Sequence, residues 1–104
     1  MLLAKVTGQV VATQKDGKLK GRKLCVLRPL QVDAATGELV EGKTTVIALD
    51  SLGAGEGEIV LFCQGSSARQ AEGLKEVPVD AAVVGIVDSV DVMKKTLYKG
   101  GKKQ

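Results

Sequence analysis

Histidine, the side chain most often used to move protons near neutral pH, is absent from this chain of 104 residues. Acid–base chemistry would therefore depend on carboxylates, and these show no spacing typical of an acid–base pair or a metal site. Six carboxylates are available, and most of them adjoin predicted strand ends: Asp50, Glu56, Glu58, Asp80, Asp88 and Asp91. We interpret these as solvated side chains, and we expect no enzyme activity, no catalytic residue, no metal site and no cofactor.

The two cysteines, Cys25 and Cys63, each lie inside an apolar run. Buried cysteines of this kind usually behave as small apolar side chains, which predicts reduced thiols rather than a disulfide or a nucleophile. Two cysteines without histidine also make a poor zinc site.

Glycines at positions 53, 55 and 57 could suggest a phosphate-binding loop. In such loops the glycines follow a strand and open a helix, whose amide groups hold the anion. Here they precede the apolar run at 59–62, which predicts a strand, and Glu56 and Glu58 would repel a phosphate. A tight turn or a close contact between subunits is the better interpretation.

Ser66, Ser67 and Arg69 form a better candidate for binding an anion, because hydroxyl groups and a guanidinium could converge at a helix start. The alternative, which we favour, is that the serines cap a short helix at 65–71 and Arg69 pairs with a carboxylate.

Short segments with β-type patterns must position these residues. Alternating apolar residues predict a half-buried strand at 2–12. Further strands are predicted at 23–30, 44–49, 58–64 and, within the segment 80–90, at 82–87, with a hairpin tip at 33–42 and a short terminal strand at 96–98. Pro29 cannot donate to a ladder, so we expect it at an edge or near a strand end. Five main strands and one short helix predict an all-β fold, a small five-stranded barrel of the oligonucleotide-binding (OB) type.

The second, fourth and fifth of these strands carry apolar residues on both faces. One face fills the barrel, so we expect the other to contact a neighbouring subunit. A domain this small hides only roughly 60 to 68% of its surface on folding, so a partner would add stability.

A barrel of this type raises the alternative of binding single-stranded nucleic acid, often on aromatic platforms. The only aromatic residues are Phe62 and Tyr98, and no groove of stacking rings can be built from them. The formal net charge is +3, and five lysines lie in the last eleven residues: Lys94, Lys95, Lys99, Lys102 and Lys103. We interpret this segment as a solvated basic tail. No apolar run approaches the roughly 20 residues of a membrane span, and no secretion signal opens the chain, so we expect a cytoplasmic protein without membrane partners.

Three blocks of sequence, in order, resemble the pentameric vertex proteins of bacterial microcompartment shells. They are the opening block at 3–24, the central block at 50–70 and the closing block at 78–88. The resemblance implies a structural shell protein that forms a homopentamer and closes the corners of a carboxysome or metabolosome shell built from hexameric tiles. It also implies a vertex domain at 1–92, followed by the basic tail at 93–104. Encapsulated cargo is a further conceivable partner, whereas nucleic acid is not expected.

Glycine and small polar residues let two backbones approach closely, which is what a subunit boundary requires. We therefore hypothesise that the loop at 52–57 or the turn at 65–69 lies at a subunit boundary or near the central opening of the pentamer. The candidate residues are Leu52, Gly53, Ala54, Gly55, Glu56, Gly57, Ser66, Ser67 and Arg69.

Overall fold

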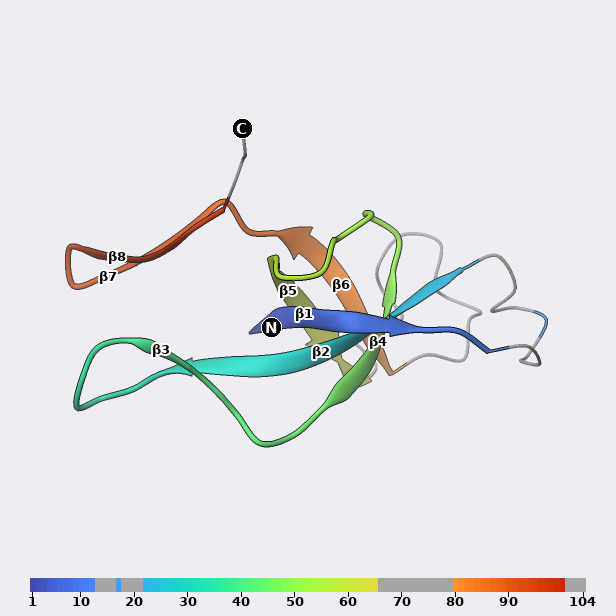
Figure 1. Ribbon diagram of the computed structural model, residues 1–104, viewed down its shortest axis with the longest axis horizontal. Coiled ribbons are helices and arrows are strands. Elements are labelled where there is room, and N and C mark those ends of the chain that lie inside the picture. Colours follow the sequence, from blue (N-terminus) through green and yellow to red (C-terminus); the bar gives the residue numbers. More distant parts are fainter. Residues whose placement is uncertain (13–16, 18–21, 66–79, 101–104) are drawn as a thin grey trace.

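The computed structural model describes residues 1–12, 17, 22–65 and 80–100, which form an all-β fold (Figure 1). In that part of the chain no helix has the length and apolar character needed to cross a membrane. The strands are β1 (Leu2–Val10), β2 (Lys23–Val32), β3 (Leu39–Glu41), β4 (Val46–Asp50), β5 (Ile59–Gln64), β6 (Ala81–Ile86), β7 (Ser89–Val92) and β8 (Lys95–Lys99).

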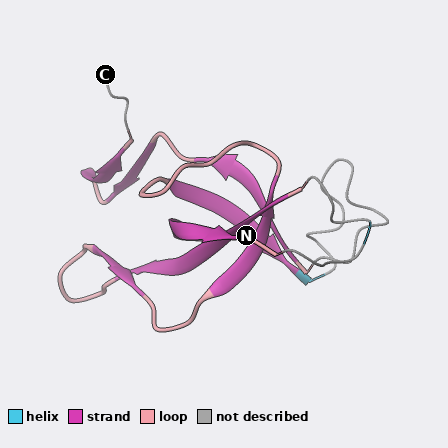
Figure 2. Ribbon diagram, turned by 45° about the vertical axis from the view of Figure 1, so that its right-hand side comes forward, coloured by secondary structure: helices cyan, strands magenta, loops and turns pink. Residues whose placement is uncertain are grey.

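Five strands close into a barrel (Figure 2). Around the barrel they follow the order β1, β5, β6, β4, β2 and back to β1. Closure pairs both edges of every barrel strand, which removes edges that would otherwise invite aggregation. All neighbours are antiparallel except β4 and β6, a parallel pair with only two matched positions, Leu49 with Ala82 and Asp50 with Val83. The predicted five-stranded barrel is confirmed.

The barrel interior is filled by small and branched side chains around one ring, Phe62, which is fully buried. On β1, Ala4 and Val6 point inward and are buried, as the alternation predicts. The core residues are Ala4, Val6, Cys25, Leu27, Ala48, Ala54, Val60, Phe62, Ala81 and Val83.

Three further buried side chains, Leu49, Ile59 and Ala82, lie outside this core cluster. Each follows or precedes an inward-facing residue along its strand, so strand alternation points it out of the barrel. The outer faces of β4, β5 and β6 therefore carry apolar side chains, as the doubly apolar pattern predicts for the strands at 58–64 and 82–87, but these three are already covered within the subunit.

The predicted hairpin at 33–42 is present as the turn between β2 and β3, which pair from Val32 with Leu39 to Leu30 with Glu41. Asp33 Oδ1 accepts hydrogen bonds from the backbone N–H groups of Ala35 (2.7 Å) and Thr36 (3.1 Å), which fixes the turn. Pro29 is the last β2 residue paired with β1, and its carbonyl accepts a bond from Gly42 N at 2.9 Å.

The strand predicted at 82–87 within the segment 80–90 is present as β6, and the structure adds a second strand, β7, after it. The break falls at Val87 and Asp88, where Val87 N donates to Ile59 O (2.9 Å) and Asp88 O accepts from Gly100 N (2.7 Å). These bonds turn the chain out of the barrel, although the apolar pattern continues across them.

Beyond that break, β7 and β8 form a hairpin that contains the predicted short strand at 96–98. Its turn is made by Met93 and Lys94, which both adopt positive φ (54° and 65°). The division of the chain after residue 92 falls in this turn and stays a prediction. The short helix predicted at 65–71 lies, apart from Gly65, outside the described residues.

Candidate functional site

The loop between β4 and β5, at residues 51–58, is held by hydrogen bonds to two of the protein's own carboxylates. Asp50 Oδ1 accepts from Leu52 N (2.9 Å) and Gly53 N (3.2 Å), and Asp50 Oδ2 accepts from Ala54 N (2.8 Å). At the other end, Glu58 Oε1 accepts from Gly55 N at 2.5 Å. The amide groups that a phosphate would need are therefore already used, which supports the interpretation of the loop as a tight turn.

Asp50 is only 4% exposed, so the interpretation of this carboxylate as a solvated strand-end side chain is wrong. Burying a charge is costly unless it is paired and hydrogen-bonded. Lys23 supplies the pairing: its Nζ lies 3.8 Å from Asp50 Oδ2 and donates to Ala54 O at 3.0 Å. Asp50 thus acts as an internal cap for the loop.

The far end of the loop is tied to β1, because Gly57 N donates to Val6 O (2.8 Å) and Val6 N donates to Glu58 O (2.9 Å). Gly53 and Gly57 have φ of +82° and +92°, a backbone region that favours glycine. The result is a short loop with fixed ends.

The candidate residues of this loop differ in exposure. Leu52 is 49% exposed, Gly53, Glu56 and Gly57 are also exposed, and Gly55 is half-buried. Ala54 is 1% exposed and belongs to the core cluster, so it anchors the loop rather than presenting a surface. The remaining candidates, Ser66, Ser67 and Arg69, lie outside the described residues, and whether any candidate contacts a subunit stays a prediction.

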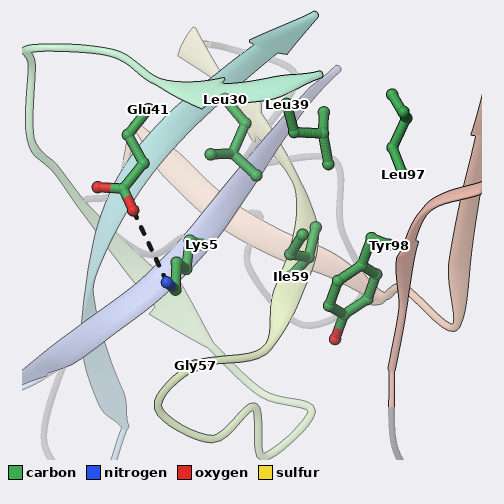
Figure 3. Close-up of a pocket in the computed structure, with 8 residues that line it drawn as sticks. All are labelled: Lys5, Leu30, Leu39, Glu41, Gly57, Ile59, Leu97 and Tyr98. Carbon is green, nitrogen blue, oxygen red and sulfur yellow. Dashed lines mark ion pairs between the residues drawn. The ribbon is translucent and has the colours of Figure 1, made fainter. Parts of the chain in front are cut away.

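A groove lies beside this loop on the outer surface of the barrel (Figure 3), and we call it the inter-hairpin groove. Its volume is about 240 Å³, and it is lined by Lys5, Leu30, Leu39, Glu41, Gly57, Ile59, Leu97 and Tyr98. The β2–β3 and β7–β8 hairpins supply Leu30, Leu39, Leu97 and Tyr98 to this lining. Sequence reasoning missed the groove, and Tyr98, an isolated aromatic in a basic segment, was the one available signal.

The charged groups around the inter-hairpin groove are paired with one another. Lys5 Nζ lies 3.7 Å from Glu41 Oε2, as Figure 3 shows. Lys95 Nζ contacts Glu38 Oε2 and so joins the β7–β8 hairpin to the tip of the β2–β3 hairpin. The groove therefore presents an apolar surface with internally neutralised charges at its edges.

The two cysteines, the reactive side chains considered in the sequence, lie in the described part of the chain. Burial raises the pKa of the Cys25 thiol from 9.0 to about 11, a rise to which Asp50 adds and which Lys23 opposes. Cys25 is therefore a protonated thiol at neutral pH, and both cysteines are free, as predicted. The described residues contain no cluster of three or more His, Cys, Asp or Glu side chains placed to hold a metal ion.

The family model EutN_CcmL, described as "Ethanolamine utilisation protein EutN/carboxysome", matches residues 1–88. The chain is 46% identical over 93 residues to the bacterial microcompartment shell vertex protein GrpN of Rhodospirillum rubrum, covering 89% of this chain and 99% of that one. It is also 46% identical over 98 residues to the carboxysome shell vertex protein CcmL of Nostoc, covering 94% of this chain and 93% of that one.

The solved structures of these two relatives have the same fold as this chain. The Nostoc CcmL structure gives a TM-score of 0.82 at 44% identity, over 96% of this chain and 100% of that one. The Rhodospirillum rubrum GrpN structure, described as a "pentameric microcompartment shell protein", gives a TM-score of 0.76 at 45% identity, over 89% of this chain and 100% of that one. The resemblance found in the sequence is confirmed.

Proposed function

The chain belongs to the EutN/CcmL family of microcompartment shell vertex proteins, and we propose that five copies of it form a ring that closes a corner of such a shell. It is a structural shell protein rather than an enzyme, as predicted, because its relatives are shell vertex proteins. Its place is the shell of a compartment in the bacterial cytoplasm.

The observation that carries the proposal is the match, over nearly its whole length, to a relative described as pentameric. The barrel adds a physical reason. Ile47, Leu52 and Ile86 are 45%, 49% and 37% exposed, and a ring contact would cover apolar side chains of this kind. A ring of five also supplies the curvature that a flat sheet of hexagonal tiles lacks, so hexameric shell tiles are the partners we propose for it.

We further propose that the loop at 52–57 lies at a subunit boundary or beside the central opening. Support comes from its fixed conformation and from the exposure of Gly53 and Gly57 between two anchored ends. Replacing Gly55 with tryptophan is expected to weaken the pentamer in sedimentation or native mass measurements. Val11→Trp is the matched control, because Val11 is 90% exposed and is not one of the loop residues. A pentamer unaffected by Gly55→Trp would contradict this placement.

The proposed function is tested by mixing the protein with candidate hexameric tiles and observing whether open sheets become closed shells. Sedimentation of the protein alone must show a pentamer, and a stable monomer would refute the proposal.

The alternative, binding of single-stranded nucleic acid, has little support from the side chains. Phe62 is fully buried, Tyr98 lies in the inter-hairpin groove and Lys95 is paired with Glu38. Titration with an oligonucleotide at increasing salt tests it, since such binding weakens steeply as salt rises.

A further inference from the structure

The β7–β8 hairpin is joined to the barrel by a single run of chain. It follows β6 through Val87 and Asp88, and beyond β8 the described chain ends at Gly100. Val87 is still tied to the barrel, because its N–H group donates to Ile59 O of β5 at 2.9 Å. Asp88 already belongs to the hairpin, because its carbonyl accepts from Gly100 N at 2.7 Å. The boundary between barrel and hairpin therefore falls between Val87 and Asp88.

The two strands of this hairpin are bonded to each other rather than to the barrel. Among the described residues, β7 and β8 form ladder pairs only with one another. Thr96 Oγ1 also donates to Asp91 Oδ1 across the hairpin, at 2.8 Å. The hairpin stands away from the barrel, on the same side as the β2–β3 hairpin (Figures 1 and 2). Its backbone bonds therefore hold its own strands together but do not fix its angle to the barrel.

One ion pair ties the far end of the β7–β8 hairpin to the rest of the described chain. Lys95 Nζ contacts Glu38 Oε2 next to the tip of the β2–β3 hairpin, and both side chains are about half exposed. Lys94 and Lys99, on the same hairpin, form no salt bridge with any described residue. The position of the hairpin tip thus depends on a contact that an exposed pair of charges makes.

The position of the hairpin decides whether the inter-hairpin groove exists. Leu97 and Tyr98 of β8 supply one side of the groove, and the barrel and the β2–β3 hairpin supply the other lining residues (Figure 3). Leu97 and Tyr98 are only half-buried, and about 240 Å³ of open groove lies between the two sides. Apolar packing across the groove is therefore incomplete, which leaves the ion pair as the specific contact that holds the hairpin in place.

We propose that the β7–β8 hairpin is a hinged arm, which bends between Val87 and Asp88 and is held in a closed position by the ion pair between Lys95 and Glu38. The closed arm builds the inter-hairpin groove, and release of the ion pair opens it. Because salt screens exposed charges, the arm responds to ionic strength. The inference goes beyond the proposed function and does not rest on it, since every part of the device lies in one subunit.

Tyr98 gives a direct signal of the arm position. It is the only tyrosine of a chain that contains no tryptophan, so the intrinsic fluorescence of the protein comes from the arm. The ring faces the inter-hairpin groove when the arm is closed (Figure 3). Acrylamide is an uncharged quencher, so its quenching constant measures how accessible the ring is to solvent at any salt concentration.

The experiment compares acrylamide quenching in the unsubstituted protein, in Lys95→Glu, in Glu38→Lys and in the double variant with both changes. Each single change brings two like charges together, which should shift the ratio of open to closed arm roughly fivefold and raise the quenching constant. The double variant restores an ion pair with reversed polarity, so its quenching constant should return to that of the unsubstituted protein. Lys99→Glu is the matched control, because it makes the same charge change on the same strand at a residue without a described salt bridge.

Salt supplies a second readout, which a merely structural effect of the substitutions would not produce. Raising the ionic strength from about 0.1 M to about 1 M shortens the screening length from about 10 Å to about 3 Å. Relative to Lys99→Glu, quenching should then increase in the unsubstituted protein and the double variant, where salt weakens an attraction. It should decrease in both single variants, where salt weakens a repulsion.

Three results would overturn the inference. The first is a pair of single variants quenched no more than the unsubstituted protein, and the second is a double variant quenched as strongly as the single ones. The third is the same direction of salt response in all four proteins. Each result is read from Tyr98 within one subunit, so it is distinct from a failure of the protein to form a pentamer.

Discussion

The internal cap at Asp50 allows a test of how much burial amplifies a hydrogen bond in this protein. The perturbation is Asp50→Ala, which removes three acceptor contacts to backbone N–H groups and the partner of Lys23. The chain offers a matched control at Asp33. Asp33 Oδ1 also accepts two backbone N–H bonds within a turn, but that turn is exposed.

The expected magnitudes follow from the surroundings of each carboxylate. The Asp50 side chain has no exposed surface, so its removal leaves the buried N–H group of Ala54 without its acceptor and takes the carboxylate partner away from Lys23. Breaking a buried charged pair in this way costs about 3–5 kcal/mol of unfolding free energy. At Asp33 water replaces the lost acceptor, so Asp33→Ala is expected to cost about 1 kcal/mol.

The assay is urea unfolding of the two variants and the unsubstituted protein at one protomer concentration, because association changes apparent stability. Asp50→Asn is a useful third variant, since it keeps Oδ1 as an acceptor. Its free energy of unfolding should lie between those of the unsubstituted protein and Asp50→Ala. Equal losses at Asp50 and Asp33, within about 0.5 kcal/mol, would show that burial does not decide the strength of this cap, and the reasoning would be refuted.

Three further outcomes are expected. Gly57→Ala should lower the free energy of unfolding by about 1–2 kcal/mol, because the φ of Gly57 is +92°. Gly55→Ala should change it by less than about 0.5 kcal/mol, because Glu58 leaves room for a methyl group. Similar losses for the two variants in urea unfolding would contradict this. Between pH 9 and about 11 the Cys25 thiol loses its proton in the unfolded chain but keeps it in the folded protein. The free energy of unfolding should therefore fall more steeply with rising pH in the unsubstituted protein than in Cys25→Ala. Parallel pH curves for the two proteins would contradict this. Replacing Met93 with asparagine and Lys94 with glycine should remove the strain of the β7–β8 turn and slow amide hydrogen exchange in that hairpin, and unchanged exchange would show that the turn is not what limits it.

The barrel could be predicted from the sequence because its strands are short, β-patterned and separated by recognisable turns. The turn at Asp33 is of this kind, with an aspartate that caps its own loop. The β7–β8 hairpin was harder to predict, because Met93 and Lys94 give no turn signal.

The candidate site was only partly predictable. Periodicity and glycine content located the loop at 52–57, but they could not show that Asp50 is buried, since a strand-end aspartate is usually solvated. The inter-hairpin groove depends on Lys5, Ile59 and Tyr98 meeting from distant parts of the chain. Such a meeting is set by the closure of the barrel, which no local pattern encodes.

The two-position parallel contact between β4 and β6 has a consequence for synthesis on the ribosome. Strands β1 and β2 pair early, as a local antiparallel unit, but β4 gains its second neighbour only when Val83 has been made. Until then β4 of a nascent chain has one edge without a hydrogen-bonding partner strand, and in a polysome several such chains lie near one another. Synthesis of the last fifth of the polypeptide therefore decides whether each copy closes its own barrel or whether β4 first pairs with a strand of another nascent chain.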